Sequence, residues 1–351
     1  MIVSNHDATR LDLSEDPFWS EHLKDVLASR DEPSSIFVAQ ETPEFYRPDP
    51  TAKNVARIEW ETSKIIDYDY RGNPLFNWVK QLNAMDEVWA ASEFTRKVLQ
   101  DSGVETDIEV IPHPVDLEMY SPGERTFMGM SRGKACNEDK FTALSAFQFT
   151  PRKNPTALLT AWSRSSLGKR DDCCLLLKTY GASFDNNSHI VNDIARFGRD
   201  LNIAGLKKNV FPLTSLVPEH AMPQLYRAAD IFITTTRGEG FCLPVSEAAA
   251  CGLPCIYTDA TAHTEFAVGY PVKCFPEPVT GMPHIPWYAA DQNWWTIDQL
   301  DLIDKLEEAY ADWKSGKLRE LGKMARMEVS RLHSDERVGK LIRERVRALT
   351  S

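Results

Sequence analysis

The sequence predicts an α/β protein built from two domains, each with a parallel sheet. Its 351 residues suffice for two sizeable cores, and 42% hydrophobic with 26% charged residues is ordinary for a globular protein. Short buried strands alternate with helical segments along most of the chain, which is the pattern of parallel α/β layers. Residues 119–140 are rich in turn-forming Pro and Gly, so we place the linker between the domains there.

The first domain is predicted over residues 1–118. An amphipathic helix is expected over 17–30, strands at Ser35–Gln40, Asn54–Trp60, Val88–Ala91 and Asp107–Ile111, and helices at Asn73–Met85 and Ser92–Gly103. Ser92 is a typical helix N-cap and Gly103 a typical helix terminator. Helices between short strands favour parallel pairing of those strands.

Charge is distributed unevenly along the chain. Residues 1–118 carry 11 Lys and Arg against 24 Asp and Glu, a net −13, whereas the whole chain carries −11. An acidic first half argues against a nucleic-acid partner and against docking to anionic lipid. No apolar run approaches the length of a membrane span, and the N-terminus lacks the basic and apolar regions of a secretory signal. We therefore expect no integral membrane segment and a cytoplasmic location.

The seven cysteines also favour a reducing compartment. Their number is odd and they form no disulfide-like framework, so we expect free thiols. None shows the paired CxxC spacing of a zinc site, and we interpret them as small hydrophobic residues.

The second domain is predicted over residues 141–330, followed by a last helix within 331–351. Strands are expected at Phe141–Phe147, Asp172–Lys178, Asn209–Leu213, Asp230–Thr236 and Pro254–Thr258, with helices from Pro155, over 217–230, at Pro244–Cys251, Asp298–Trp313, Lys317–Leu332 and Glu336–Leu349. Lys178 ends its strand either at the rim of a crevice or as a side chain that snorkels from the strand end. The sequence leaves both alternatives open.

The stretch Asp230–Asp259 concentrates the polar groups. Gly238 and Gly240 mark a turn after a buried strand, where the backbone can come close to a ligand. The helix that follows presents free N–H groups and a partial positive charge, which suit an anion. Taken singly, Glu239 could be a solvated loop residue and Glu247 a charge that favours the helix dipole. Turn and helix geometry would also let both carboxylates face the mouth of one crevice.

The stretch from Glu239 to Pro254, EGFCLPVSEAAACGLP, resembles the donor-site signature of GT-B retaining glycosyltransferases of the GT4 family. That signature is a Glu, seven residues and a Glu within E-G-F-G-L-P-x-x-E-A-x-A-C-G-x-P, and Cys242 replaces one of its glycines. The resemblance implies that Glu239 contacts the transferred sugar. It also implies that Glu247 holds the ribose hydroxyls of a nucleotide, since a carboxylate accepts two hydroxyl protons at once.

The same resemblance implies further contacts with the donor. Backbone N–H groups near the turn would face the sugar or the diphosphate, and the loop 214–217 would hold the nucleotide base. The donor-binding residues expected besides Glu247 are therefore Gly240, Phe241, Cys242, Leu243, Thr214 and Leu216.

Arg152 and Lys153 lie just before the helix that starts at Asn154-Pro155, so they predict a clamp for a diphosphate. In the family the matching lysine binds the donor phosphates, usually with an arginine shortly before it. That earlier position is Phe147 here, and Arg152 is the remaining candidate for the second cation. Together with Glu239, Lys153 and Arg152 form the predicted catalytic set, which would stabilise the charge of a leaving diphosphate.

Three more stretches resemble the family. Glu61-Thr62 and Asp86–Phe94 match motifs of its first domain, and Ile111–Asp116 matches I-P-[HN]-G-V-D with a proline in place of glycine. These motifs support the fold more than any chemical role, and His113 within the last of them is expected to be a structural loop residue. His263 stays without an assigned role.

The resemblance thus implies the GT-B fold, with two Rossmann-like domains facing across a cleft and a shortened first domain. The implied reaction transfers a sugar, with retention, from a nucleotide-diphosphate sugar to a glycan, lipid-linked or other acceptor. It implies no cofactor beyond that donor substrate and no metal, because Asp67-Tyr68-Asp69 has metal-motif spacing but lies in the first domain.

Two other functions stay open on the sequence. The short first domain suits a nucleotide-sugar-binding or scaffolding protein without transfer activity, or an enzyme that requires a partner subunit or a homo-oligomer. A glycoside hydrolase with Glu239 and Glu247 as its carboxylate pair is the third alternative. It ranks last, because the phosphate-binding features would then serve nothing.

Overall fold

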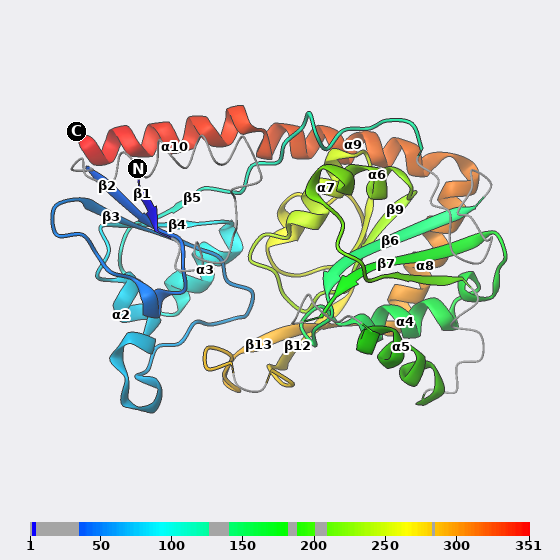
Figure 1. The fold of residues 1–351 in the computed structure, drawn as a ribbon, viewed down its shortest axis with the longest axis horizontal. Coiled ribbons are helices and arrows are strands. Elements are labelled where there is room, and N and C mark those ends of the chain that lie inside the picture. Colours follow the sequence, from blue (N-terminus) through cyan, green and yellow to red (C-terminus); the bar gives the residue numbers. More distant parts are fainter. Residues whose placement is uncertain (1, 5–34, 126–139, 182–187, 201–208, 283–284) are drawn as a thin grey trace. The chain divides into compact units, whose positions relative to one another are not determined.

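The computed structural model describes residues 2–4, 35–125, 140–181, 188–200, 209–282 and 285–351 (Figure 1). The chain divides into two units. Unit 1 comprises Met1–Pro112, His284–Gln292 and Gly339–Ser351, and unit 2 comprises His113–Pro283 and Asn293–Val338. The first boundary thus precedes the linker predicted at 119–140, and the described part of that linker belongs to unit 2. The helix predicted over 17–30 lies outside the described residues.

The described residues of unit 1 form a five-stranded parallel sheet whose strands follow chain order. The strands are β1 (Ile2–Ser4), β2 (Ile36–Ala39), β3 (Lys53–Ile58), β4 (Glu87–Ala90) and β5 (Ile108–Val110). Side chains alternate between the two faces of a strand, so Ala56, Val88 and Ala90 face one core. Trp78 and Leu99 from the helices α2 (Trp78–Leu82) and α3 (Glu93–Asp101) complete it.

The helix predicted over Asn73–Met85 is wrong in its first part. A 3₁₀ turn occupies Pro74–Phe76, and α2 begins only at Trp78. The Asn73 and Asn77 side chains accept hydrogen bonds from backbone N–H groups two and three residues further on. Each asparagine therefore starts a new short segment, because its side chain competes with the backbone for those donors. The predicted N-cap of α3 is confirmed, since Ser92 Oγ accepts the Thr95 N–H at 3.1 Å.

Two distant segments of the chain complete unit 1. The part of α10 (Asp335–Thr350) that belongs to this unit places Arg345 against the buried carboxylate of Glu87 and, at 3.0 Å, against Glu109. The described part of His284–Gln292 packs Trp287 on Trp78 and Tyr288 on Trp60, with ring centroids 6.1 and 5.6 Å apart.

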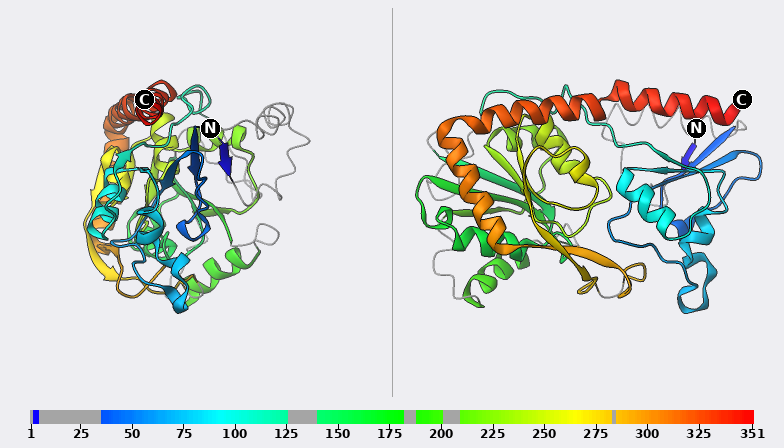
Figure 2. Two further views of the ribbon diagram at one scale, coloured as in Figure 1. Left: turned by 90° about the vertical axis from the view of Figure 1, so that its left-hand side faces the viewer. Right: turned by 180° about the vertical axis from the view of Figure 1, so that it is seen from behind.

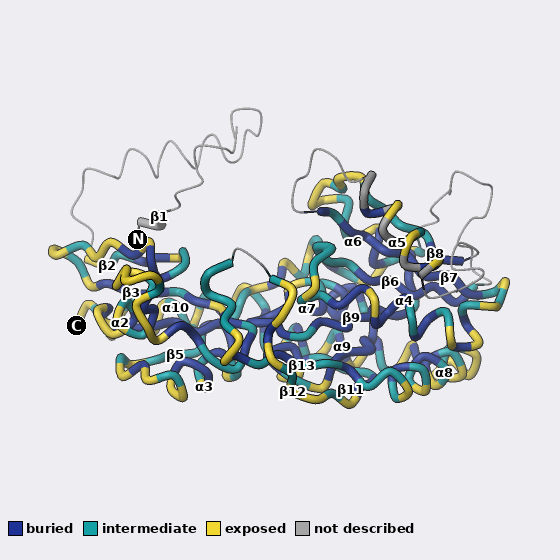
Figure 3. Tube along the Cα trace, turned by 90° about the horizontal axis from the view of Figure 1, so that it is seen from below, coloured by how far each residue is buried: buried dark blue, intermediate teal, exposed yellow. Residues whose placement is uncertain are grey.

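The described residues of unit 2 form a six-stranded parallel sheet in the order β11-β10-β9-β6-β7-β8. The strands are β6 (Phe141–Gln148), β7 (Cys173–Tyr180), β8 (Val210–Leu213), β9 (Ile231–Thr234), β10 (Cys255–Thr258) and β11 (Gly269–Val272). Figure 3 shows β6 and β9 as buried along most of their length. Strands covered on both faces read as continuous apolar runs, which is why the sequence located them.

Helices cover both faces of this sheet. The helices are α4 (Pro155–Arg164), α5 (Ser188–Asp200), α6 (Met222–Arg227), α7 (Leu243–Ala250), α8 (Gln299–Ser315) and α9 (Lys317–His333). Figure 1 shows α4 and α5 on one face and α6 and α7 on the other. The chain winds from β6 to β8, then returns across the sheet to β9, so right-handed crossovers put the later helices on the opposite face.

A hairpin that the sequence did not predict follows β11. It pairs β12 (Cys274–Pro278) with β13 (Asn293–Ile297) in antiparallel fashion. Trp294 is fully buried on it, and the Arg237 guanidinium lies 4.9 Å above that ring. Packing is therefore the role that the structure gives Trp294.

Two glycines control how α9 reaches α7. Gly316 adopts a left-handed conformation, φ 84°, which ends α8 and redirects the chain into α9, as the bend between the orange helices in Figure 2 shows. Gly322 of α9 then packs on the turn after α7, where an added Cβ would lie 2.1 Å from the Gly252 carbonyl oxygen. Only glycine permits that contact, so α9 fixes the helix that carries Glu247.

The described cysteines form no disulfide, and the described residues hold no group of three or more His, Cys, Asp or Glu suited to a metal ion. Asp67 and Asp69 pair instead with Lys64 and Lys80. None of the helices in the described ranges has the length and apolar character that crossing a membrane demands.

We predict opposite effects for alanine at two helical glycines. Gly322→Ala should lower the free energy of unfolding by about 1–3 kcal/mol, because the methyl group collides with backbone. Gly339→Ala is the matched control in α10, where the added Cβ meets only the Arg343 side chain. That variant should gain up to about 1 kcal/mol from helix propensity. Urea unfolding of both variants checks this, and an unchanged Gly322→Ala would contradict the packing argument.

Candidate donor-binding site

The candidate site lies at the carboxyl edge of the unit 2 sheet, where β6 and β9 are neighbours. From β6 the chain adds β7 and β8 on one side, and it adds β9 and the later strands on the other. Loops that follow two strands at such a reversal leave toward opposite faces, and parallel α/β sheets bind ligands there. The loop after β6 holds Arg152 and Lys153, and the loop after β9 holds Glu239.

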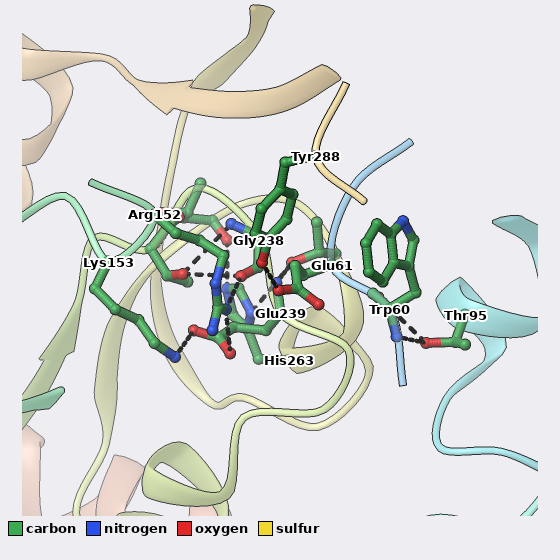
Figure 4. Close-up of polar contacts among 12 residues, drawn as sticks. Trp60, Glu61, Thr95, Arg152, Lys153, Gly238, Glu239, His263 and Tyr288 are labelled. Carbon is green, nitrogen blue, oxygen red and sulfur yellow. Dashed lines mark hydrogen bonds and ion pairs between the residues drawn. The ribbon is translucent and has the colours of Figure 1, made fainter. Parts of the chain in front are cut away.

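These three side chains form an ionic cluster around the buried carboxylate of Glu239 (Figure 4). Lys153 Nζ lies 2.5 Å from Glu239 Oε1, and Arg152 Nη1 lies 3.2 Å from Oε2. Arg152 also donates to the Gly238 carbonyl at 2.7 Å. The Glu239 side chain is 7% exposed, so its charge depends on the two cations rather than on water. The structure thus brings all three predicted catalytic residues together.

The pKa of Glu239 depends on both its burial and the two neighbouring cations. Burial by itself raises the pKa, but the charges of Lys153 and Arg152 outweigh burial and lower it to about 2. Glu239 is therefore ionised at neutral pH. The cluster carries two positive charges and one negative charge, which leaves one net positive charge at the carboxyl edge of the sheet.

Backbone contacts lock the two loops together. The Arg237 N–H donates to the Arg152 carbonyl at 2.8 Å, and Thr235 Oγ1 donates to the Asn154 carbonyl at 3.0 Å. Asn154, the N-cap of α4, has a left-handed backbone with φ 53°. Because each loop supplies partners for the other, the cations and the carboxylate are held before any ligand arrives.

A third loop, after β10, supports the Glu239 turn, and the sequence did not assign it this role. Thr261 Oγ1 accepts the Glu239 N–H at 3.2 Å, and the Ala262 N–H donates to the Glu239 carbonyl at 3.2 Å. His263 is fully buried beneath them, with Nε2 2.8 Å from the Thr258 carbonyl oxygen. Burial lowers the pKa of His263, which favours its neutral form. The position of His263 in a loop close to the signature could have indicated a role at the site, but the sequence did not identify its hydrogen-bond partner.

The start of α7 follows the turn directly. Cys242 is the N-cap with φ 85° and ψ 70°, a left-handed conformation that explains why the signature has glycine there. Its side chain makes no capping hydrogen bond, and a proline follows Leu243. Burial raises the pKa of the Cys242 thiol, so it is unreactive. Of the other residues predicted here, Phe241 is buried and Leu243 is exposed, while Gly240 lies within the turn.

Phe241 anchors the turn in an aromatic cluster. Its ring centroid lies 5.2 Å from that of Phe266, 4.9 Å from that of His333 and 5.1 Å from that of His113. Burial lowers the pKa of His333 to about 4, so this imidazole is neutral at neutral pH. His113 therefore packs as the structural residue that the sequence predicted.

Glu247 belongs to a different network, on α7. Its Oε2 accepts the Tyr226 hydroxyl at 2.6 Å, and the Tyr120 hydroxyl is a second partner. Burial raises the pKa of Glu247, whereas the two hydroxyls act in the opposite direction. Two tyrosines thus fix the carboxylate that the sequence predicted as the ribose ligand. Tyr226 and Tyr120 were missed, because nothing in their spacing points to Glu247.

The loop predicted for the base follows β8. Thr214 is partly buried, and Leu216 is 78% exposed. Both lie beyond Leu213, which is paired with Lys178 of β7. The predicted base loop and the ionic cluster therefore lie at the same edge of one sheet, because carboxyl ends of parallel strands meet there.

Residues 130–269 match the family model described as glycosyl transferases group 1. That range contains the ionic cluster, the turn, α7 and the loop after β8. This part of the chain is therefore similar to a glycosyl transferases group 1 domain. The resemblance to glycosyltransferases that the signature indicated is thereby confirmed.

Curated relatives support the same domain. A D-inositol 3-phosphate glycosyltransferase of Geodermatophilus obscurus is 32% identical over 151 residues, which are 42% of this chain and 32% of that protein. The O-antigen chain mannosyltransferase B of Escherichia coli is 27% identical over 145 residues, 41% of this chain and 35% of that protein. The matched regions span about a third of the length of these relatives.

Solved structures extend the likeness to the fold of nearly the whole chain. Sucrose-phosphate synthase from Thermosynechococcus elongatus has a TM-score of 0.64 at 18% identity, covering 97% of this chain and 80% of that one. Anabaena HepE in complex with UDP-glucose has a TM-score of 0.63 at 16% identity, covering 93% of this chain and 81% of that one. The chain has the GT-B fold, with two Rossmann-like units and the group 1 domain in unit 2.

We predict that ionisation of Glu239 makes the stability of the protein depend on pH. The folded-state pKa of about 2 lies below the unfolded value of 4.5, so the stabilisation is present above pH 4.5 and is lost as pH falls toward 2. The stability advantage of wild type over Glu239→Gln should therefore shrink by up to about 3 kcal/mol across that range. Urea unfolding at a series of pH values measures this difference. A difference that does not change with pH would refute the ionic cluster.

Proposed function

We propose that this chain is a retaining glycosyltransferase that uses a nucleotide-diphosphate sugar as donor and needs no metal ion. The observation that carries the proposal is the cluster of Lys153, Arg152 and Glu239 at the strand reversal beside the start of α7. A diphosphate requires fixed cations and N–H donors, and a sugar requires carboxylate acceptors. This edge of the sheet provides both.

The donor would be bound along this edge in three parts. Lys153 and Arg152, with the N–H groups at the start of α7, would take the diphosphate. Glu239 would accept sugar hydroxyls while it keeps the two cations in place. Glu247, oriented by Tyr226, would accept the ribose hydroxyls, and the loop 214–217 would receive the base.

The reaction would break the bond between the anomeric carbon and the diphosphate oxygen. Negative charge builds on the leaving diphosphate, and the fixed cations lower the barrier because they do not need to reorganise. The acceptor hydroxyl attacks from the side that the diphosphate leaves, which retains the configuration. Its proton passes to the departing phosphate oxygen, so no enzyme base or nucleophile is required.

The comparisons support this proposal at the level of the family. Relatives of the group 1 domain are named as glycosyltransferases and a mannosyltransferase, and HepE was solved with UDP-glucose. A nucleotide-sugar-binding protein without transfer activity is the alternative that the first experiment must exclude. It would retain the donor site and never release nucleoside diphosphate.

We predict that Lys153→Met lowers transfer by about 100-fold or more, because a fixed cation is lost at the leaving group. The donor is first identified by screening UDP-, GDP- and ADP-sugars for thermal stabilisation of the wild-type protein. Release of nucleoside diphosphate from that donor is then measured with a panel of glycan and lipid-linked acceptors.

Lys273→Met is the matched control, because Lys273 is a 77%-exposed side chain of the same unit. It should leave transfer within about twofold of wild type. Donor binding without turnover on any acceptor would favour the binding protein, and full activity of Lys153→Met would refute the site.

We also predict that Glu247 accepts hydrogen bonds from the ribose hydroxyls. Glu247→Gln should weaken binding of the nucleoside diphosphate by about tenfold, because a charge-assisted hydrogen bond is lost. The 2′,3′-dideoxy analogue should bind both proteins equally. Calorimetric titration of both ligands gives the comparison, and equal losses for the two ligands would exclude a ribose contact.

A further inference from the structure

Lys178 of β7 is a buried cation that the proposed chemistry does not use. The residue is only 8% exposed, so little of its side chain reaches water at the strand end. Its nearest aromatic partner is Tyr180, whose ring centroid lies 5.8 Å from Nζ. That distance is at the outer limit of a cation–π contact and compensates little of the lost hydration.

No carboxylate pairs with Lys178 among the described residues. Two partly buried cations of unit 2 differ from it in this respect, because Lys153 is paired with Glu239 and Arg125 with Asp230. Burial accordingly lowers the pKa of Lys178, with no charge acting in the opposite direction. A largely buried lysine without a counter-charge destabilises a protein, so its presence suggests a partner that the described residues do not supply.

The sheet places Lys178 at the edge where the donor is proposed to bind. It is in register with Ala146 of β6 on one side and with Leu213 of β8 on the other. β8 ends at Leu213, and β7 itself ends two residues beyond Lys178. The strand order therefore puts Lys178 between the loop of Arg152 and Lys153 and the loop that follows β8.

The side chain also lies on the face opposite the main core. Cys173, Leu175 and Leu177 alternate with it and pack into the cluster that contains α4. Strand alternation therefore puts Lys178 on the other face of the sheet. Figure 1 shows α6 and α7 on that face. Glu247 is on that same face, on α7.

We propose that Lys178 is a third phosphate-binding cation of the donor site, beyond Lys153 and Arg152. This inference rests on the proposed function, because it assumes a nucleotide at this edge of the sheet. A phosphate is the ligand that the observations favour, since a buried ammonium is compensated best by an anion. Lys178 could instead contact a carbonyl group of the base, which would supply only a partial charge. The experiment must distinguish that contact from phosphate binding.

The test replaces the ammonium with an apolar group of similar length. Lys178→Met should raise the melting temperature of the free protein, or leave it unchanged, because an uncompensated buried charge is removed. The same change should weaken binding of a nucleoside diphosphate by about 10- to 100-fold, the effect expected from losing one charged hydrogen bond. Opposite effects on stability and affinity distinguish a ligand-binding cation from a structural one.

The ligands are whichever of UDP, GDP and ADP binds wild type best, and the nucleoside of that same base, each titrated calorimetrically. Lys178→Met should weaken binding of the nucleoside diphosphate, while its affinity for the nucleoside should stay within about twofold of wild type. Lys169→Met is the control, because Lys169 is exposed and precedes the opposite, amino end of β7. It should change neither the melting temperature nor either affinity.

The outcomes separate this inference from the function on which it rests. If wild type binds none of the three nucleotides, the proposed function fails. If wild type binds and Lys178→Met binds the diphosphate equally well, only the role of Lys178 is overturned. Equal weakening of the diphosphate and the nucleoside would assign Lys178 to the base and overturn its assignment to phosphate.

Discussion

The carboxylate of Glu239, buried between two cations, is the interaction on which the site of unit 2 depends. A lone carboxylate at 7% exposure would be neutral or would disrupt the turn, and two lone cations would repel each other. In the cluster these charges compensate one another, because Lys153 and Arg152 are each within hydrogen-bond distance of a different carboxylate oxygen of Glu239. The turn that carries Glu239 and the loop that carries the cations are consequently held as one structure.

The surrounding backbone is organised to maintain this arrangement. The Arg237 N–H joins the two loops directly, while Thr261 and Ala262 bind the backbone of Glu239 from a third loop. All three loops leave carboxyl ends of neighbouring parallel strands, so the sheet itself fixes their spacing. Groups held in this way need little rearrangement when a charged ligand binds, which is the physical basis of electrostatic preorganisation.

Charge compensation also distinguishes Lys178 from two other cations of unit 2. Lys153 and Arg125 each have a carboxylate partner, so their charges are compensated within the protein. Lys178 is buried among the described residues without one. Stability alone would favour an apolar residue at that position, so the ammonium is best explained by a ligand. The same reasoning identifies functional sites generally, because binding groups are often stabilised only once the ligand is present.

The sequence by itself determined the fold class, most strands of both sheets and the family, because buried parallel strands are continuous apolar runs and the signature is local. It singled out Glu239 and Lys153, since each lies beside a glycine turn or a helix start, and the structure brings their side chains into contact. The tertiary structure alone decided that Tyr226 holds Glu247, that Thr261 supports the turn, and that Lys178 is buried without a carboxylate partner among the described residues. Those facts depend on which strands become neighbours, and strand order is set by long-range packing that no local pattern records.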